Sequence, residues 1–145
     1  ITGEGAEGYY KSGIRAAMEF TAANTPVKYQ HGVKIDDAYI ASYLEGPQVK
    51  FGASATENLN RIYKQKYILY FLQHEWDAFF ECRRTGVPEL PVNPSTNMNT
   101  DPSKMLVRWM YPQTEYDRNN ANVMEAIARQ YDGLDNENCV MWLLK

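Results

Sequence analysis

Residues 54–88 read SATENLNRIYKQKYILYFLQHEWDAFFECRRTGVP, and this stretch decides the fold of the chain. It opens on Ser54 and Glu57, which are spaced as a capping box: the serine oxygen accepts the Glu57 amide, and the glutamate reaches back to the cap. No glycine or proline follows before Gly86. One unbroken helix over this stretch would be about 45 Å long, which exceeds the width of a small domain. We therefore predict a helical hairpin that turns near residues 73–74.

The middle of this stretch, YILYFL at residues 67–72, is apolar at six consecutive positions. These positions point to all sides of a helix. A helix that is apolar all round is usually buried on all sides, so we expect this segment to be covered by the hairpin partner or by a larger protein.

The end of the stretch, RRTGVP at residues 83–88, has two interpretations. Arg83 and Arg84 would complement the dipole in the last turn of a helix. Gly86 suits the left-handed position that follows a helix, and Pro88 prevents the helix from resuming. We interpret the motif as a helix end, with contact to an acidic ligand as the alternative.

Four further elements follow from periodicity and turn chemistry. Apolar residues at helical spacing predict a helix over residues 7–23, and an aspartate cap predicts a short helix over 36–44. Prolines and asparagines dominate the region that follows, so we expect residues 85–145 to be irregular, with a short strand at 106–111 and one helix at 122–131. Residues 1–84 are expected to be helical.

Composition limits the possible functions. Apolar residues make up 44% of the 145 residues and the net charge is −3, so the basic surface typical of nucleic-acid-binding proteins is missing. The two cysteines, Cys82 and Cys139, define neither a disulfide framework nor a metal site. Aromatic residues reach 13%, and tyrosine-rich surfaces suit sugars and other polar partners, although most of these rings are expected in the core.

No motif for catalysis or metal binding is complete. The sequence HEWDA at residues 74–78 has alanine where a zinc protease needs its second histidine. Glu75, Asp77 and Glu81 could supply the carboxylate pair of a glycoside hydrolase, but their helical spacing does not favour that geometry. The acidic turn with Asp132, Asp135 and Glu137 does not match a calcium-binding loop. We expect no cofactor.

Five segments, taken in order along the chain, resemble one protein family. Residues 9–19 (YYKSGIRAAME) resemble the "YY…GIRASME" helix of SusD/RagB-type outer-membrane lipoproteins, and residues 65–71 (QKYILYF) resemble their "QKWIALF" segment. Residues 77–88 (DAFFECRRTGVP) are similar to "EAWNEWRRTGYP". Residues 108–123 (RWMYPQTEYDRNNANV) and 142–145 (WLLK) resemble the family's C-terminal "RxxYPxxEY…NV" and "WWDK".

The resemblance implies the C-terminal part of a single SusD-like domain over residues 1–145, within a longer, mainly α-helical protein. Tetratricopeptide-like hairpins would come from segments such as 55–84, followed by the long irregular Pro/Asn-rich C-terminal region. It also implies a nutrient-binding protein, not an enzyme, on the cell surface, lipid-anchored to the bacterial outer membrane through a part outside this segment. Such a protein passes an oligosaccharide, or a peptide, to a SusC-like TonB-dependent transporter. The remaining partner would be the N-terminal remainder of the same protein.

Three loop residues are our candidates for contact with a sugar: Tyr29, His31 and Trp109. An aromatic ring offers an apolar face to a sugar, and polar side chains bond its hydroxyls. The alternatives are a core position for Trp109 and a solvated loop for the other two. A helical glycoside hydrolase and a helical-hairpin module that binds proteins are the rival functions.

Overall fold

The computed structural model describes residues 4–71, 73–74 and 76–144. The chain divides into two units, residues 1–88 and 89–145. All regular elements in the described residues are helical, and no strand occurs among them. This agrees with the predicted mainly α fold. None of the described helices combines the length and the apolarity that a bilayer span requires.

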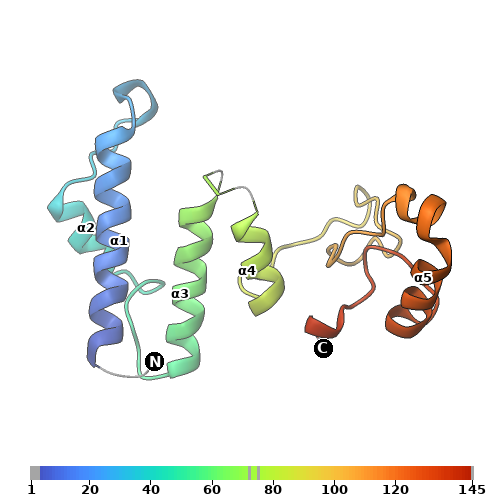
Figure 1. Ribbon diagram of the computed structural model, residues 1–145. Helices are drawn as coiled ribbons and strands as arrows, with labels where there is room; N and C mark the ends of the chain where they lie inside the picture. The colour runs from blue at the N-terminus through green and yellow to red at the C-terminus, as the bar shows by residue number, and fades with distance from the viewer. Residues whose placement is uncertain (1–3, 72, 75, 145) are drawn as a thin grey trace. The chain divides into compact units, whose positions relative to one another are not determined.

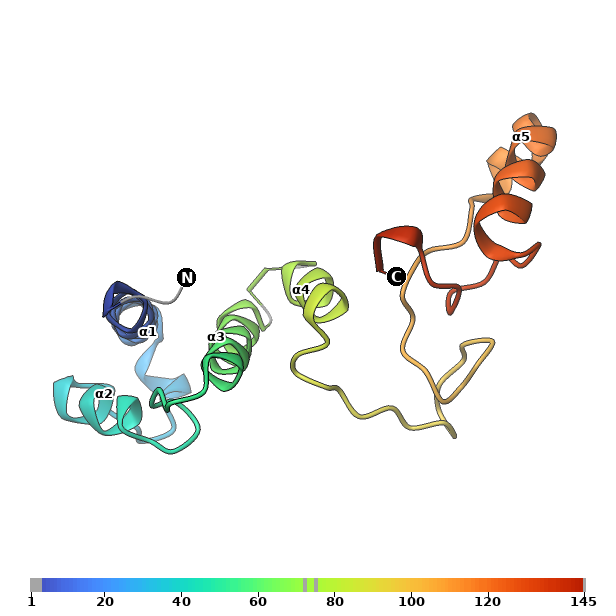
Figure 2. The ribbon, with the colours of Figure 1, turned by 90° about the horizontal axis from the view of Figure 1, so that it is seen from below.

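The first unit contains four α-helices: α1 (Glu4–Asn24), α2 (Asp37–Leu44), α3 (Ala55–Tyr70) and α4 (Asp77–Thr85). A short 3-10 helix, Val27–Tyr29, follows α1. Within this unit α3 stands between α1 and α4, and α2 packs against α1 (Figures 1 and 2). The predicted hairpin is therefore present as α3 and α4, because α3 ends at Tyr70 and the chain turns before α4.

Local chemistry sets the ends of these helices. The Ser54 hydroxyl accepts the Glu57 amide at 3.3 Å, and Asp36 accepts the Tyr39 amide at 3.0 Å, as predicted for both caps. The Glu57 carboxylate lies 3.6 Å from Arg61. At the other end of the hairpin, Gly86 has φ +70° and its amide bonds the Cys82 carbonyl, so the RRTGVP motif ends α4 as expected.

The core of the first unit is small. Among the described residues, its buried apolar side chains are Ile14, Ile40 and Val49, which lie on α1, on α2 and in the loop that follows α2. Tyr10 closes this core, since its hydroxyl donates to the Val49 carbonyl at 2.8 Å and its ring stacks on Phe51. Burial raises the pKa of the Tyr10 hydroxyl to about 12.

The prediction that residues 67–72 are buried on all sides is wrong for this chain. Ile68, Leu69 and Phe71 are exposed, while Tyr67 and Tyr70 are half-buried; Leu72 lies outside the described residues. The reason is that, in the described part of the chain, α1 and α4 are the main helices packed on α3 and leave part of its surface uncovered.

The second unit is built on α5 (Gln113–Tyr131) and ends in a short 3-10 helix, Trp142–Leu144. The predicted start of α5 at residue 122 is wrong, because the helix begins at Gln113 after Pro112. Asn119 interrupts it with φ −138°. The side-chain amide of Asn122 donates to Asn119 Oδ1 at 2.6 Å. The helix ends where expected, at Asp132 and Gly133, both with positive φ.

The predicted strand at residues 106–111 is also wrong. The amides of Val107 and Arg108 both approach one carbonyl, that of Glu137, at 2.9 and 3.3 Å. A strand needs a ladder of successive bonds along a partner, and the described residues show none here. The segment is an extended connection.

Candidate functional site

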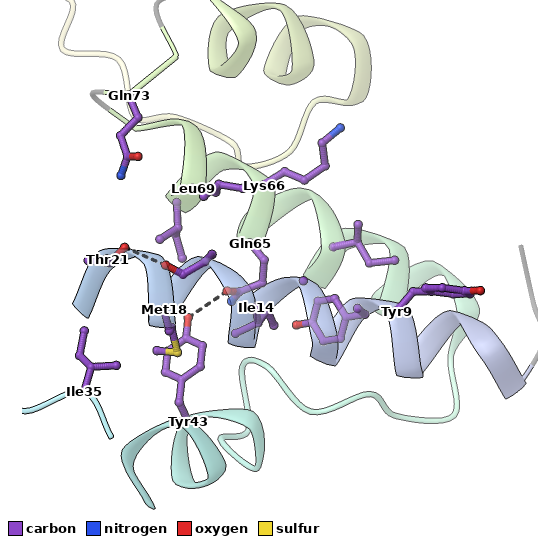
Figure 3. A pocket seen from close by; sticks show the side chains of 15 residues that line it. Tyr9, Ile14, Met18, Thr21, Ile35, Tyr43, Gln65, Lys66, Leu69 and Gln73 are labelled. Carbon is purple, nitrogen blue, oxygen red and sulfur yellow. Dashed lines mark hydrogen bonds between the residues drawn. The ribbon is translucent and has the colours of Figure 1, made fainter. Parts of the chain in front are cut away.

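An open pocket with a volume of about 430 Å³ lies between α1 and α3 in the first unit. We call it the α1–α3 pocket. Tyr9 lies at one end and Gln73 at the other (Figure 3). Between them the lining is mostly aliphatic, from Ile14, Ala17, Met18, Ile35, Ile62, Ile68 and Leu69.

Several polar groups of this pocket already form hydrogen bonds or ion pairs with other protein groups. The Tyr43 hydroxyl donates to Gln65 Oε1 at 3.0 Å (Figure 3). The Lys66 ammonium pairs with Glu81 of α4 at 2.6 Å. Gly13 also lines the pocket, and a Cβ added there would meet no atom within 4 Å. An aliphatic pocket with few available polar groups suits apolar protein side chains better than sugar hydroxyls.

The three candidate sugar contacts lie at two places. Tyr29 and His31 share the turn after α1, where Tyr29 is 57% exposed and His31 is exposed with φ +50°. The Lys28 ammonium lies 4.6 Å from the centre of the Tyr29 ring. Trp109 belongs to the second unit and is 62% exposed, which contradicts its alternative interpretation as a core residue.

A group of aromatic side chains at the start of α4 was not singled out by the sequence analysis. Trp76 precedes the helix, and its ring centre lies 6.0 Å from that of Phe79 and 6.5 Å from that of Phe80. The Arg83 guanidinium lies 5.2 Å from the Phe79 ring centre. The i,i+4 spacing of Trp76 and Phe80 was the available signal for a shared helix face.

Of the carboxylates considered for hydrolysis, the two that the structure describes, Asp77 and Glu81, are each paired with a basic side chain. Glu81 pairs with Lys66 at 2.6 Å and with Arg84 at 3.0 Å. The Arg84 hydrogen bond lowers the pKa of this carboxyl, outweighing its burial, and Lys66 acts in the same direction. Asp77 lies 3.3 Å from the His74 imidazole, and Glu75 lies outside the described residues.

The second unit has a buried charged centre formed by Arg108 and Asp135. Arg108 is 5% exposed, pairs with Asp135 and lies 4.2 Å from the Tyr131 ring centre. Asp135 also accepts the Tyr116 hydroxyl at 2.6 Å and the Tyr111 amide at 3.0 Å. Burial alone would raise the pKa of Asp135, but these hydrogen bonds and the Arg108 charge lower it.

The acidic turn considered for calcium is therefore occupied by protein contacts. Glu137 accepts the Thr100 amide, and Asp135 belongs to the charged centre. Among the residues that the structure describes, no group of three or more His, Cys, Asp or Glu side chains could hold a metal ion. Cys82 and Cys139 are free thiols.

Residues 1–112 match the profile of a protein family described as "Starch-binding associating with outer membrane", the SusD-like family. The chain belongs to this family. SusD-like proteins are binding proteins and not enzymes.

Solved structures agree with this SusD-like assignment. A SusD homologue from Bacteroides fragilis NCTC 9343 is 44% identical, with a TM-score of 0.88 over 100% of this chain and 31% of its own. A second homologue from the same organism is 38% identical, with a TM-score of 0.81 over 100% of this chain and 30% of its own. A chitin-binding protein is 25% identical, with a TM-score of 0.72 over 100% of this chain and 29% of its own.

The SusD-like chain thus spans about three tenths of the length of the solved relatives that it matches. No curated protein sequence matches it.

Proposed function

We propose that the chain is part of a nutrient-binding protein at the bacterial outer membrane, that it faces the cell surface, and that its ligand is an oligosaccharide. The match of residues 1–112 to a starch-binding family carries this proposal. A relative that binds chitin supports a carbohydrate ligand. A peptide is the alternative ligand.

The partners of the whole protein belong to the same proposal. The bound oligosaccharide is passed to a SusC-like TonB-dependent transporter, and a lipid anchor outside residues 1–145 holds the protein at the membrane. Neither nucleic acid nor a cofactor takes part.

We further propose that the α1–α3 pocket packs against the N-terminal remainder of a longer protein. The solved relatives are about three times as long as the matched region, and the aliphatic lining suits apolar side chains of such a segment. The space above Gly13 allows a close approach. A Gly13→Leu substitution should block that approach and weaken binding of the unmatched part of the Bacteroides fragilis homologue, added as a separate polypeptide, while leaving glycan binding unchanged.

Retardation in native gels cast with polysaccharides tests the main proposal. The panel contains amylopectin, xylan and glycol chitin, with a gel without polysaccharide as reference. Retardation without release of reducing ends supports a binding protein, whereas reducing-end release supports the rival hydrolase. Tyr29→Ala, His31→Ala and Trp109→Ala variants then test the three candidate contacts one by one.

A protein-interaction module without carbohydrate affinity predicts a different result. The chain would then capture the separate polypeptide but migrate equally in all gels. That result would remove the oligosaccharide from the proposal for this chain.

A further inference from the structure

The two sides of α4 have different environments. Glu81 faces α3, where its side chain is 13% exposed and pairs with Lys66 at 2.6 Å. Trp76 and Phe80 lie one helical turn apart and are 49% and 51% exposed. Residues four apart lie on the same face of a helix, so these two rings form one exposed aromatic surface at the start of α4.

Two further side chains of α4, Phe79 and Arg83, lie close to the rings of this surface. Phe79 is half-buried, and its ring centre lies 6.0 Å from Trp76, nearly perpendicular to it, and 5.6 Å from Phe80. The Arg83 guanidinium lies 5.2 Å from Phe79 and 5.9 Å from Phe80. These contacts fix the orientation of the exposed rings, which lowers the entropy cost of placing a ligand on them.

Two polar side chains, His74 and Asp77, are close to Trp76 in the sequence. The His74 imidazole and the Asp77 carboxylate lie 3.3 Å apart, and each side chain is about half exposed. Tyr70 supports His74 from below, with ring centres 5.0 Å apart. The surface thus combines apolar faces with a donor and an acceptor of hydrogen bonds, a combination that the aliphatic α1–α3 pocket lacks.

We propose that Trp76 and Phe80, together with His74 and Asp77, form an oligosaccharide-binding platform on α4. The two rings stack on the apolar faces of two sugar units, and the imidazole and carboxylate bond hydroxyl groups at the edge of the sugar. This assignment rests on the proposed carbohydrate-binding function, and it adds a site distinct from Tyr29, His31 and Trp109. A carbohydrate fits this surface better than an apolar protein segment, because sugar hydroxyls can bond the half-exposed His74 and Asp77 groups, whereas an apolar segment would only remove water from them.

Trp76→Ala and Phe80→Ala variants test the platform in amylopectin and glycol chitin gels and by titration with maltoheptaose and N-acetylchitohexaose. Each substitution should weaken binding about tenfold or more, because it removes one stacking surface. Trp76→Phe keeps a ring and should restore most of the affinity. Phe20→Ala is the matched control, since Phe20 is an exposed aromatic residue (64%) on α1. Helical content by circular dichroism checks that each variant folds.

A direct measurement accompanies the gels. The three tryptophans give three indole N–H signals in a ¹H–¹⁵N spectrum, and the signal that disappears in Trp76→Phe belongs to Trp76. Addition of the oligosaccharide that binds should shift this signal.

The outcomes separate the two proposals. Binding that survives both alanine substitutions, with an unmoved Trp76 signal, overturns the platform and leaves the carbohydrate function standing. If the wild-type chain binds no glycan of the panel, both the platform and the carbohydrate function of this chain fall, because the platform lies wholly within it. Equal losses in Phe20→Ala and the platform variants also overturn the assignment.

Discussion

The two units of this chain are stabilised in different ways. The first consists of four helices with a small apolar core and exposed apolar side chains on α1 and α3. The second has one long helix, and its irregular segments are held by polar side chains around a buried ion pair. Helices form from local signals, whereas the second unit depends on contacts between residues far apart in sequence. The two units should therefore respond differently to the same kind of substitution.

The largest expected effect is the loss of the charged centre in the second unit. Arg108→Met leaves the Asp135 carboxylate buried without its counter-charge, which should cost about 3–5 kcal/mol of the stability of that unit. Hydrogen exchange of the α5 amides should accelerate strongly, while that of the α3 amides stays as in the wild type. Arg129→Met, which removes an exposed ion pair with Glu125, is the matched control and should change little. Equal effects of both substitutions would contradict the comparison.

A smaller loss should appear on acidification. The folded-state pKa of Asp135 is lowered from 3.8, so the unfolded chain binds more protons at acidic pH. The stabilisation by Asp135 is complete when the pH is above the unfolded-state pKa of about 4. It is lost as the pH falls from there through the folded-state pKa. Exchange of the α5 amides, measured as the pH is lowered, follows this loss.

Asp135→Asn is the variant that isolates this contribution. In this variant the stability of the second unit should fall less steeply as the pH is lowered. The acid sensitivity of the first unit, where Glu81 also has a lowered pKa, should stay unchanged. Asp101, whose pKa is lowered to about 2 by bonds from Ser103 and Lys104, should retain its own effect. If Asp135→Asn left the acid-induced loss of stability of the second unit unchanged, other carboxylates would be responsible for that loss.

In the first unit, substitution of a single glycine should have a moderate effect that depends on its position. Gly86→Ala places a side chain at φ +70° and should cost about 1–2 kcal/mol. Gly8→Ala lies within α1, where an added Cβ meets no atom within 4 Å, and should stabilise the unit by about 0.5–1 kcal/mol. Thermal unfolding followed at 222 nm measures both. Changes of the same sign would show that the ends of these helices are not set locally.

The smallest effect is expected at the cap of α3. Ser54→Ala removes the acceptor of the Glu57 amide and should cost about 1 kcal/mol or less. Ser12→Ala, an exposed position within α1, is the control and should be neutral or slightly stabilising. Both are compared by the midpoint of thermal unfolding. A larger loss in Ser12→Ala would count against the cap.

Some expectations failed because they depended on distant partners. Residues 106–111 were expected to form a strand, but the amides of Val107 and Arg108 bond the Glu137 carbonyl, about thirty positions further along the chain. The start of α5 was missed because residues 113–120 are polar and lack apolar periodicity. Pro112, at the cap of that helix, was the local signal.

The sequence by itself determined the caps of α2 and α3, the end of α4 and the hairpin. Ser54, Asp36 and Gly86 act on backbone groups within a few residues, so their effect can be inferred without knowing the rest of the fold. The ordered motifs of residues 9–123 also indicated the SusD-like family, which the match over residues 1–112 then showed.

Only the tertiary structure decided which side chains are buried and which are available for binding. Arginine is usually found at the surface, but Arg108 is buried among Tyr131, Tyr111 and Asp135. Tryptophan and phenylalanine are usually found in the core, but Trp76 and Phe80 are half exposed. Burial depends on what packs against a residue from elsewhere in the chain, and neither periodicity nor residue type carries that information.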